Sequence, residues 1–315
     1  MIARCVLIFI FLSSFVPLYG QGFLNANSWK KFRKEYIIQI GVSGFLGDLG
    51  GRDRIGTDFS PVDFDIQAKK MAVSLAYRYK FIPNIGLHTS FNYLGITGND
   101  NLTQERFRNN RNLNFKSNIF ELAARLELGT HNLKSRGIYS IKKSLRRYRK
   151  SLKTELIGFA GIGVFYFNPK GLDPNTGKYI SLWNLHTEGQ GLANGPRQYK
   201  KIAVSIPVGL LFHMTLKKLW SVGLELNYRF TLSDYLDDVS GVYYSREDLA
   251  LAYGTKSVQM ADPNKGLISG QTLPNADGTG AQRGDNNKDS FMSLQLTIGK
   301  AFKKTRRKTK LRTKF

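Results

Sequence analysis

Histidine and serine side chains at alternating positions are the first candidates for chemistry in this sequence. His88 and Ser90 are two residues apart, so they would share one face of a β-strand, and His213 lies in a later segment of similar pattern. A histidine in this position could act as the base that activates a serine for attack on a lipid ester. That chemistry also needs an acid that orients the base and a nucleophile motif, and neither is recognisable here. We therefore expect no catalytic residues and predict that the protein is not an enzyme.

Two other patterns could bind a ligand. Asp285, Asn287 and Asp289 alternate as the oxygen ligands of a calcium loop do, but the remaining ligands and the terminal glutamate are missing. The glycines between Gly41 and Gly51 precede no helix signal, so they do not predict a phosphate-binding loop. We expect no metal and no cofactor.

The net charge of +24 would ordinarily indicate a nucleic-acid partner or an anionic membrane surface. The N-terminus argues against nucleic acid, because it has the pattern of an export signal: Arg4, an apolar run from Val6 to Val16, and a cleavage region from Pro17 to Gly20. The run is shorter than the ~20 apolar residues of a membrane-spanning helix. We predict that residues 1–20 are a signal peptide. The only cysteine, Cys5, precedes the apolar run, so the mature chain would have no thiol or disulfide.

Beyond the signal, the pattern of the chain is strict two-residue alternation. The clearest case is 220–231, where Leu224 and Leu226 alternate with Glu225 and Asn227. Eight segments alternate in this way: residues 35–46, 71–80, 85–93, 120–128, 154–167, 202–212, 220–231 and 290–302. No run is long enough for a spanning helix, and only helices and closed barrels satisfy every backbone hydrogen bond in lipid. We predict an all-β fold: residues 35–302 form a transmembrane antiparallel up-and-down β-barrel of about eight strands. The predicted location of this barrel is the outer membrane.

Alternating connection lengths orient this barrel. The long connections, residues 47–66, 97–116, 168–200 and 232–289, would be outer loops, and the connections at 81–84, 129–153 and 215–219 would be periplasmic. Residues 21–34 would form an N-terminal periplasmic segment, and residues 303–315 a basic periplasmic tail.

The positions expected to face the lumen carry both signs of charge: Arg78, Glu121, Arg125, Glu127, Glu155, Glu225 and Arg229. Charges inside a small barrel are best satisfied by one another, and an eight-stranded barrel is filled by its own side chains. This pattern favours a filled structural lumen over the alternative of a narrow polar conduit.

Two predicted periplasmic segments hold 17 of the 47 basic residues, nine in 134–153 and eight in 303–314. In the first, Ile138, Ile141, Leu145 and Leu152 recur at roughly helical spacing, which predicts a basic amphipathic helix. It could lie on anionic lipid head groups or meet an acidic periplasmic partner, although solvated turns remain the simpler alternative. The candidate partner-binding residues are Lys142, Lys143, Arg146, Arg147, Arg149, Lys150, Lys303, Lys304, Arg306 and Arg307.

The most distinctive stretch is acidic and aromatic, and it follows the strand at 220–231. It reads Ser-Asp-Tyr-Leu-Asp-Asp-Val-Ser-Gly from Ser233 to Gly241. From the residue types we expect an ordered turn at the barrel rim, with Asp234, Asp237 and Asp238 accepting hydrogen bonds from local backbone amides. Tyrosines here could equally belong to an interfacial girdle.

This run resembles the signature of the PorG family of outer-membrane barrels in Bacteroidetes, through Asp234, Tyr235, Asp237, Asp238 and Gly241. The resemblance implies a non-enzymatic component of the type IX secretion and gliding machinery. Its implied partners are periplasmic ring proteins resembling PorK and PorN, together with outer-membrane lipids. The alternative function is that of a general small outer-membrane barrel, either a porin-like conduit or a surface-binding protein.

Overall fold

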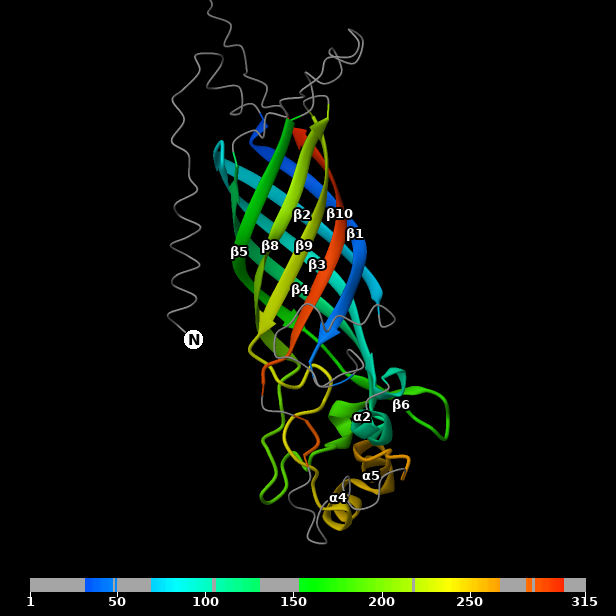
Figure 1. The fold of residues 1–315 in the computed structure, drawn as a ribbon. Helices are drawn as coiled ribbons and strands as arrows, with labels where there is room; N and C mark the ends of the chain where they lie inside the picture. Colours follow the sequence, from blue (N-terminus) through cyan, green and yellow to red (C-terminus); the bar gives the residue numbers. More distant parts are fainter. Residues whose placement is uncertain are drawn as a thin grey trace, which may run out of the picture.

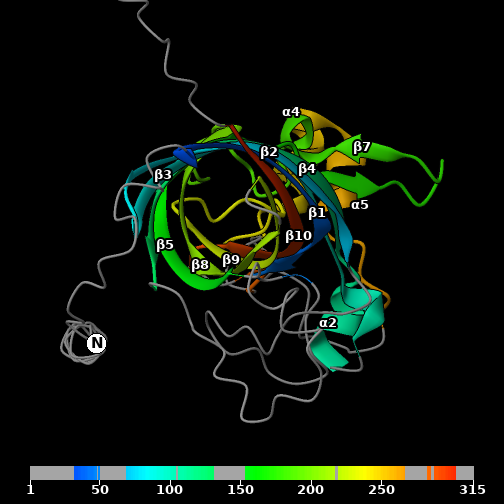
Figure 2. The ribbon, with the colours of Figure 1, turned by 90° about the horizontal axis from the view of Figure 1, so that it is seen from above.

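A closed antiparallel β-barrel is the main feature of the computed structural model, which describes residues 32–47, 49, 69–103, 106–130, 153–216, 219–266, 282–284 and 287–302. The wall consists of β1 (Lys34–Leu46), β2 (Lys70–Ile82), β3 (Ile85–Asn99), β4 (Asn114–Gly129), β5 (Lys153–Tyr166), β8 (Ile202–Leu216), β9 (Trp220–Thr231) and β10 (Ser290–Phe302). Their order is β3-β2-β1-β10-β9-β8-β5-β4, and pairing between β3 and β4 closes the ring (Figure 2). The predicted fold class, an antiparallel barrel of eight strands, is confirmed.

Two of the strands, β3 and β4, are longer than the sequence pattern predicted. Pairing between β3 and β4 continues to Asn99 opposite Asn114. The connection between these strands is therefore shorter than the predicted loop at 97–116, and it contains η3 (Asp100–Leu102) and α2 (Arg106–Arg111). The inward positions of this extension are apolar, and Leu94, Ile96 and Phe115 are fully buried there. The predicted parts of the same strands have polar inward positions, so the apolar residues change face and the alternation is interrupted. Backbone pairing continues the ladder there, and the Thr97 hydroxyl donates a hydrogen bond to the Phe115 carbonyl at 2.6 Å.

The exterior of the wall is apolar. Outward-facing leucines from different strands leave much of their side chains exposed, with Leu75 at 58%, Leu122 at 66% and Leu296 at 64%. Neighbouring strands bring such residues side by side, as Ile38 lies between Ile298 and Leu75. A continuous apolar band on the outside of a closed barrel with a polar interior has the character of a lipid-facing surface.

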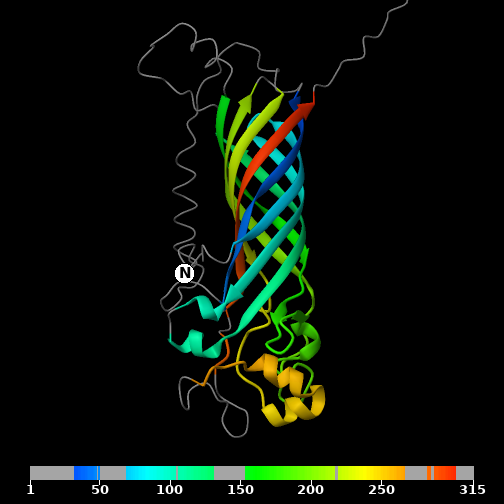
Figure 3. The same cartoon turned by 90° about the vertical axis from the view of Figure 1, so that its right-hand side faces the viewer.

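The described parts of the connections at 97–116, 168–200 and 232–289 fold into a compact structure at one end of the barrel (Figures 1 and 3). It contains η3, α2, β6 (Lys170–Leu172), β7 (Tyr179–Ser181), η4 (Leu182–Leu185), α4 (Arg246–Tyr253) and α5 (Thr255–Ala261). Together with the loop at 232–244 we call these elements the cap. The sequence predicted loops in these regions, and their secondary structure was missed. β6 and β7 are only three residues each, and they form because β6 adds to the edge of β4 beyond the point where β5 ends.

The main apolar core lies where the cap meets the barrel, not in the middle of the barrel. Its buried members include Phe115, Phe165 and Phe291 from the strands, and Leu236 and Val239 from the acidic loop. Local signals support the cap helices, since Ser245 caps the first turn of α4 by accepting a hydrogen bond from the Asp248 amide. No helix in the described ranges is long and apolar enough to span a membrane.

Candidate functional site

The predicted pairing of charges inside the barrel is present. Arg78 from β2 donates hydrogen bonds to the Glu127 carboxylate at 2.5 Å and to the Glu35 carboxylate at 2.8 Å. Arg78 is fully buried, so both ion pairs lie inside the barrel, enclosed by the strands. Glu35 is a partner that the sequence analysis missed, because the first strand gave a weak pattern and its glutamate was not assigned to the lumen.

Two further arginines complete this lumen network. Arg125 donates two hydrogen bonds of 2.6 Å to Glu225 on the opposite side of the barrel, and its guanidinium lies 3.8 Å from the centre of the Phe159 ring. Arg229 donates to Glu121 at 2.8 Å. The remaining predicted lumen acid, Glu155, lies 3.5 Å from the Lys80 ammonium group. These links run across the interior, which favours a filled lumen over a conduit.

The histidine and serine candidates face the same interior. His88 is buried beside Arg125, with Nε2 3.3 Å from a guanidinium nitrogen, and Ser90 accepts a hydrogen bond from the Asn92 amide at 3.1 Å. His213 is also buried, 3.7 Å from a Glu35 oxygen. Their positions hold them within a network of paired charges, away from the outer surface that a lipid would reach. The absence of enzymatic activity stays a prediction.

The acidic loop forms the base of the cap, and it is ordered, as expected. The Asp237 carboxylate accepts a hydrogen bond from the Val239 amide at 3.0 Å, which is the predicted local turn. Asp234 accepts from the Ser240 hydroxyl at 2.6 Å, and the carbonyl of Gly241 accepts from the Arg283 and Gly284 amides. The loop is therefore tied both to itself and to the segment at 282–284.

Asp238 differs from the prediction of a local amide bond. Its carboxylate accepts hydrogen bonds from the Thr187 hydroxyl and the Tyr199 hydroxyl, each at 2.6 Å, and both partners lie in the connection between β5 and β8. The residue has a left-handed backbone, φ 67°, a conformation that aspartate adopts more readily than most residues. Burial disfavours the charged form, and the pKa of Asp238 rises to about 6 in spite of the nearby Arg283.

Arg283 joins three parts of the cap. It is fully buried and donates hydrogen bonds to the Glu188 carboxylate at 2.8 Å, the Asp238 carbonyl at 2.6 Å and the Ala261 carbonyl at 3.2 Å. Glu188 in turn accepts from the Ser240 amide at 2.8 Å. Sequence reasoning missed both residues, because nothing local marks an arginine and a glutamate 95 residues apart as partners.

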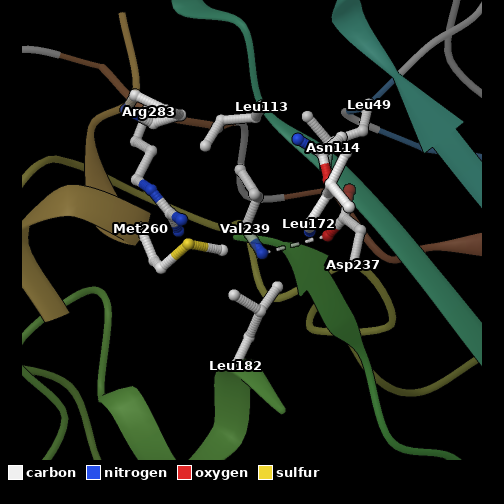
Figure 4. Close-up of a pocket in the computed structure, with 10 residues that line it drawn as sticks. Leu49, Leu113, Asn114, Leu172, Leu182, Asp237, Val239, Met260 and Arg283 are labelled. Carbon is white, nitrogen blue, oxygen red and sulfur yellow. Dashed lines mark hydrogen bonds between the residues drawn. The ribbon is translucent and has the colours of Figure 1, made fainter. Parts of the chain in front are cut away.

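Apolar packing fixes the loop from the other side (Figure 4). Val239, Leu182, Met260 and Leu113 converge around a cavity of about 10 Å³, and each comes from a different part of the cap or wall. That volume is roughly one water molecule. The run from Ser233 to Gly241, which we call the signature run, is thus a packed structural element at the junction of the cap and the barrel.

Tyr235 has a different role from the neighbouring aspartates. Its ring stacks on Tyr199, with centroids 4.8 Å apart and planes 6° apart. The pair borders a second, open cavity of about 550 Å³ at the ends of β8 and β9. An interfacial tyrosine was one of the alternatives that the sequence left open.

The possible calcium pattern has a structural use at one of its positions. The Asp289 carboxylate accepts a hydrogen bond from the Leu236 amide at 2.9 Å and so holds the start of the signature run. Asp285 lies outside the described residues. Within the described ranges, no group of three or more histidine, cysteine or acidic residues could hold a metal ion.

The predicted partner-binding residues lie outside the described residues. This applies to Lys142, Lys143, Arg146, Arg147, Arg149 and Lys150 and to Lys303, Lys304, Arg306 and Arg307. The points from which these segments leave the barrel are described: β4 ends at Gly129, β5 begins at Lys153 and β10 ends at Phe302, all at the end opposite the cap (Figure 1). The predicted signal peptide is also outside the described ranges.

Comparison with known proteins gives similarity only to solved structures. No family model and no curated protein sequence matches the chain. The attachment invasion locus protein Ail of Yersinia pestis, solved with the heparin analogue sucrose octasulfate, is 13% identical with a TM-score of 0.34, covering 86% of this chain and 99% of Ail. Neisserial surface protein A is 6% identical with a TM-score of 0.33, covering 85% and 97%. The N-terminal β-barrel domain of Pseudomonas aeruginosa OprF is 8% identical with a TM-score of 0.29, covering 85% and 98%. Similarity at this level carries no argument about function.

Proposed function

We propose that this protein is an outer-membrane β-barrel that serves as a non-enzymatic assembly component of the type IX secretion apparatus. The observation that carries the proposal is the signature run from Ser233 to Gly241, which forms the buried junction between cap and barrel. A surface stretch that only kept the loop soluble would not need Asp237 and Asp238 to be fully buried. The resemblance of this run to the PorG family therefore concerns residues that the fold depends on.

The apolar exterior supports the membrane location. A closed barrel leaves no strand edge unpaired, and its outward leucines would be costly to expose to water but not to lipid. The lumen network supports a structural role, because the arginines and glutamates that face the interior are paired with one another.

The opposite end of the barrel would bind the periplasmic ring proteins that resemble PorK and PorN. Both basic segments, 134–153 and 303–314, begin at that end and together carry 17 basic residues. A positive surface there would attract an acidic partner and would increase its rate of association. Outer-membrane lipids would surround the wall.

A general small barrel is the second candidate. The compact cap, held together by Arg283, favours a surface-binding protein within that class over a conduit, because ordered outer loops can present a fixed surface.

Co-purification tests the ring-binding proposal. The variant ends after Phe302 and carries Arg146→Ser, Arg147→Ser and Arg149→Ser. We expect it to fold as a barrel, as judged by heat-modifiable migration, and to recover much less ring protein from detergent-solubilised membranes. The control for the three arginine substitutions carries Lys170→Ser, Lys178→Ser and Lys200→Ser at the cap end of the barrel and should recover as much ring protein as the wild type.

Deletion of the gene separates the two functions. Loss of type IX cargo secretion supports the assembly component. Normal secretion with altered permeability to small solutes, or with lost surface binding, would assign the protein to the general class instead.

A further inference from the structure

An open cavity lies at the rim where the barrel meets the cap, on the side of β8 and β9. Its volume is about 550 Å³, and we call it the rim cavity. It lies between the start of β8, the loop that follows β9, and Lys288 just before β10. No residue of the lumen network lines it, so it is distinct from the interior.

The part of the rim cavity nearest the barrel is apolar and continuous with the outer face of the wall. Ile202 and Leu232 line it, and each is 62% exposed. They extend the outward-facing rows of β8 and β9, in which Ile206 lies opposite Phe230. An apolar chain lying against these rows could therefore continue from the outer wall into the cavity.

The other part of the rim cavity, at its opening, is cationic. Lys200 and Lys288 both line it, both are exposed, and neither has an ion-pair partner in the described part of the chain. Asp234 also lines the cavity, but it is buried and its carboxylate is engaged by the Ser240 hydroxyl at 2.6 Å. Among the described residues that line the cavity, two unpaired cations stand against one engaged carboxylate, so their net charge is positive.

Two stacked tyrosine rings lie at the boundary between these two parts. Tyr199 stacks on Tyr235, and the Tyr199 hydroxyl is held by Asp238, so the two rings keep their position at the boundary. Amphipathic rings at such a boundary are typical of the layer where lipid tails give way to head groups.

We propose that the rim cavity binds a lipid that carries a phosphate on its head group, with the phosphate between Lys200 and Lys288 and an acyl chain against Ile202 and Leu232. The inference rests on the proposed membrane location and goes beyond it by assigning a specific lipid site. Lysines just above an apolar surface interact favourably with anionic head groups while their stems stay on that surface. The exposed Ile202 and Leu232 distinguish this ligand from free phosphate, which would gain nothing from them.

Native mass spectrometry of the full-length protein in detergent tests the site, with bis-phosphorylated lipid A as the probe. The wild type should retain the lipid. The variant K200Q/K288Q should retain it less, by about fivefold for each lysine removed. The control K178Q/K265Q removes the same charge from cap lysines outside the cavity and should bind as the wild type does. Lipid A without phosphates should be retained weakly by all three proteins.

Two results would overturn the proposal. Equal retention of bis-phosphorylated lipid A by K200Q/K288Q and by the control would show that the lysines do not form a site. Displacement of the lipid by inorganic phosphate at equal concentration would show that the cavity takes the free anion. Heat-modifiable folding and recovery of ring proteins, measured on the same variants, report separately on the proposed function, so that its failure can be told from failure of the lipid site.

Discussion

Asp238 shows how one residue depends on partners that are distant in sequence. Its backbone is left-handed, its carboxylate accepts hydrogen bonds from Thr187 and Tyr199, and Arg283 donates to its carbonyl. Asparagine adopts the same backbone readily, so an isosteric change is available that removes the ionisation and leaves the shape.

The raised pKa of Asp238 predicts a pH-dependent cap. An unfolded aspartate ionises near pH ~4, whereas the folded pKa is about 6. Between these values the unfolded chain releases a proton that the folded cap keeps, so the free energy of unfolding of the cap should fall as pH rises through this window. Above pH ~6 the loss should be complete, about 3 kcal/mol at most.

Asp238→Asn should lack this contribution and be the more stable protein at neutral pH. Thermal unfolding followed by fluorescence of Trp183, with Trp29 and Trp220 replaced by Phe, checks it, because the Trp183 indole donates to the Tyr199 carbonyl within the cap. The same dependence on pH in Asp238→Asn and in its parent would contradict the assignment.

At the scale of the strand, alternation determines which face a residue presents. In β9, Leu224 is 45% exposed, while its neighbour Glu225 is buried in the lumen. The one-residue difference separates the lipid-facing surface from the charge network, and a register slip would exchange the two.

Leu224→Arg should therefore impair folding into a bilayer. A cation on the lipid-facing surface near the midplane costs about 2–4 kcal/mol, and the cost falls to about 0–1 kcal/mol near the interface. Leu232→Arg is the matched control, since Leu232 continues the same outward row at the rim, just beyond the strand. Equilibrium unfolding by urea in lipid vesicles measures both. Equal destabilisation by the two substitutions would disprove the proposed depth of the wall in the membrane.

At the scale of the whole molecule, the lumen is crossed by ion pairs between strands that are far apart in sequence. Arg125 and Glu225 are separated by 100 residues, and Arg78 links β1 to β4 through Glu35 and Glu127. Removal of one partner from such a buried pair is costly, because it leaves the other charge without compensation.

A barrel closed in this way should not conduct ions. We expect no stepwise conductance when the folded wild type is inserted into planar bilayers, since the interior is occupied by side chains. Refolded protein of verified heat-modifiable migration is the necessary sample. Steady ohmic conductance by that sample would replace the structural role with the narrow conduit.

The sequence by itself determined the wall of the barrel. Two-residue alternation located all eight strands, β9 and β10 with the observed bounds, because each strand must present one face to each environment. It also placed Arg78, Arg125, Glu225 and the other lumen charges on the correct face. The ends of β3 and β4 were missed because their inward positions become apolar there, as at Leu94 and Phe115, so the alternation of the predicted parts is interrupted.

Only the tertiary structure decided the cap and its cavity. The Asp237 turn could be predicted, since its partner is two residues away, but Asp238, Glu188 and Arg283 meet through contacts between separate loops. The rim cavity likewise brings together Lys200, just before β8, and Lys288, just before β10, because these two strands flank β9 in the ring. Local periodicity carries no information about such pairs, because the closure of the barrel, and not the spacing along the chain, brings them together.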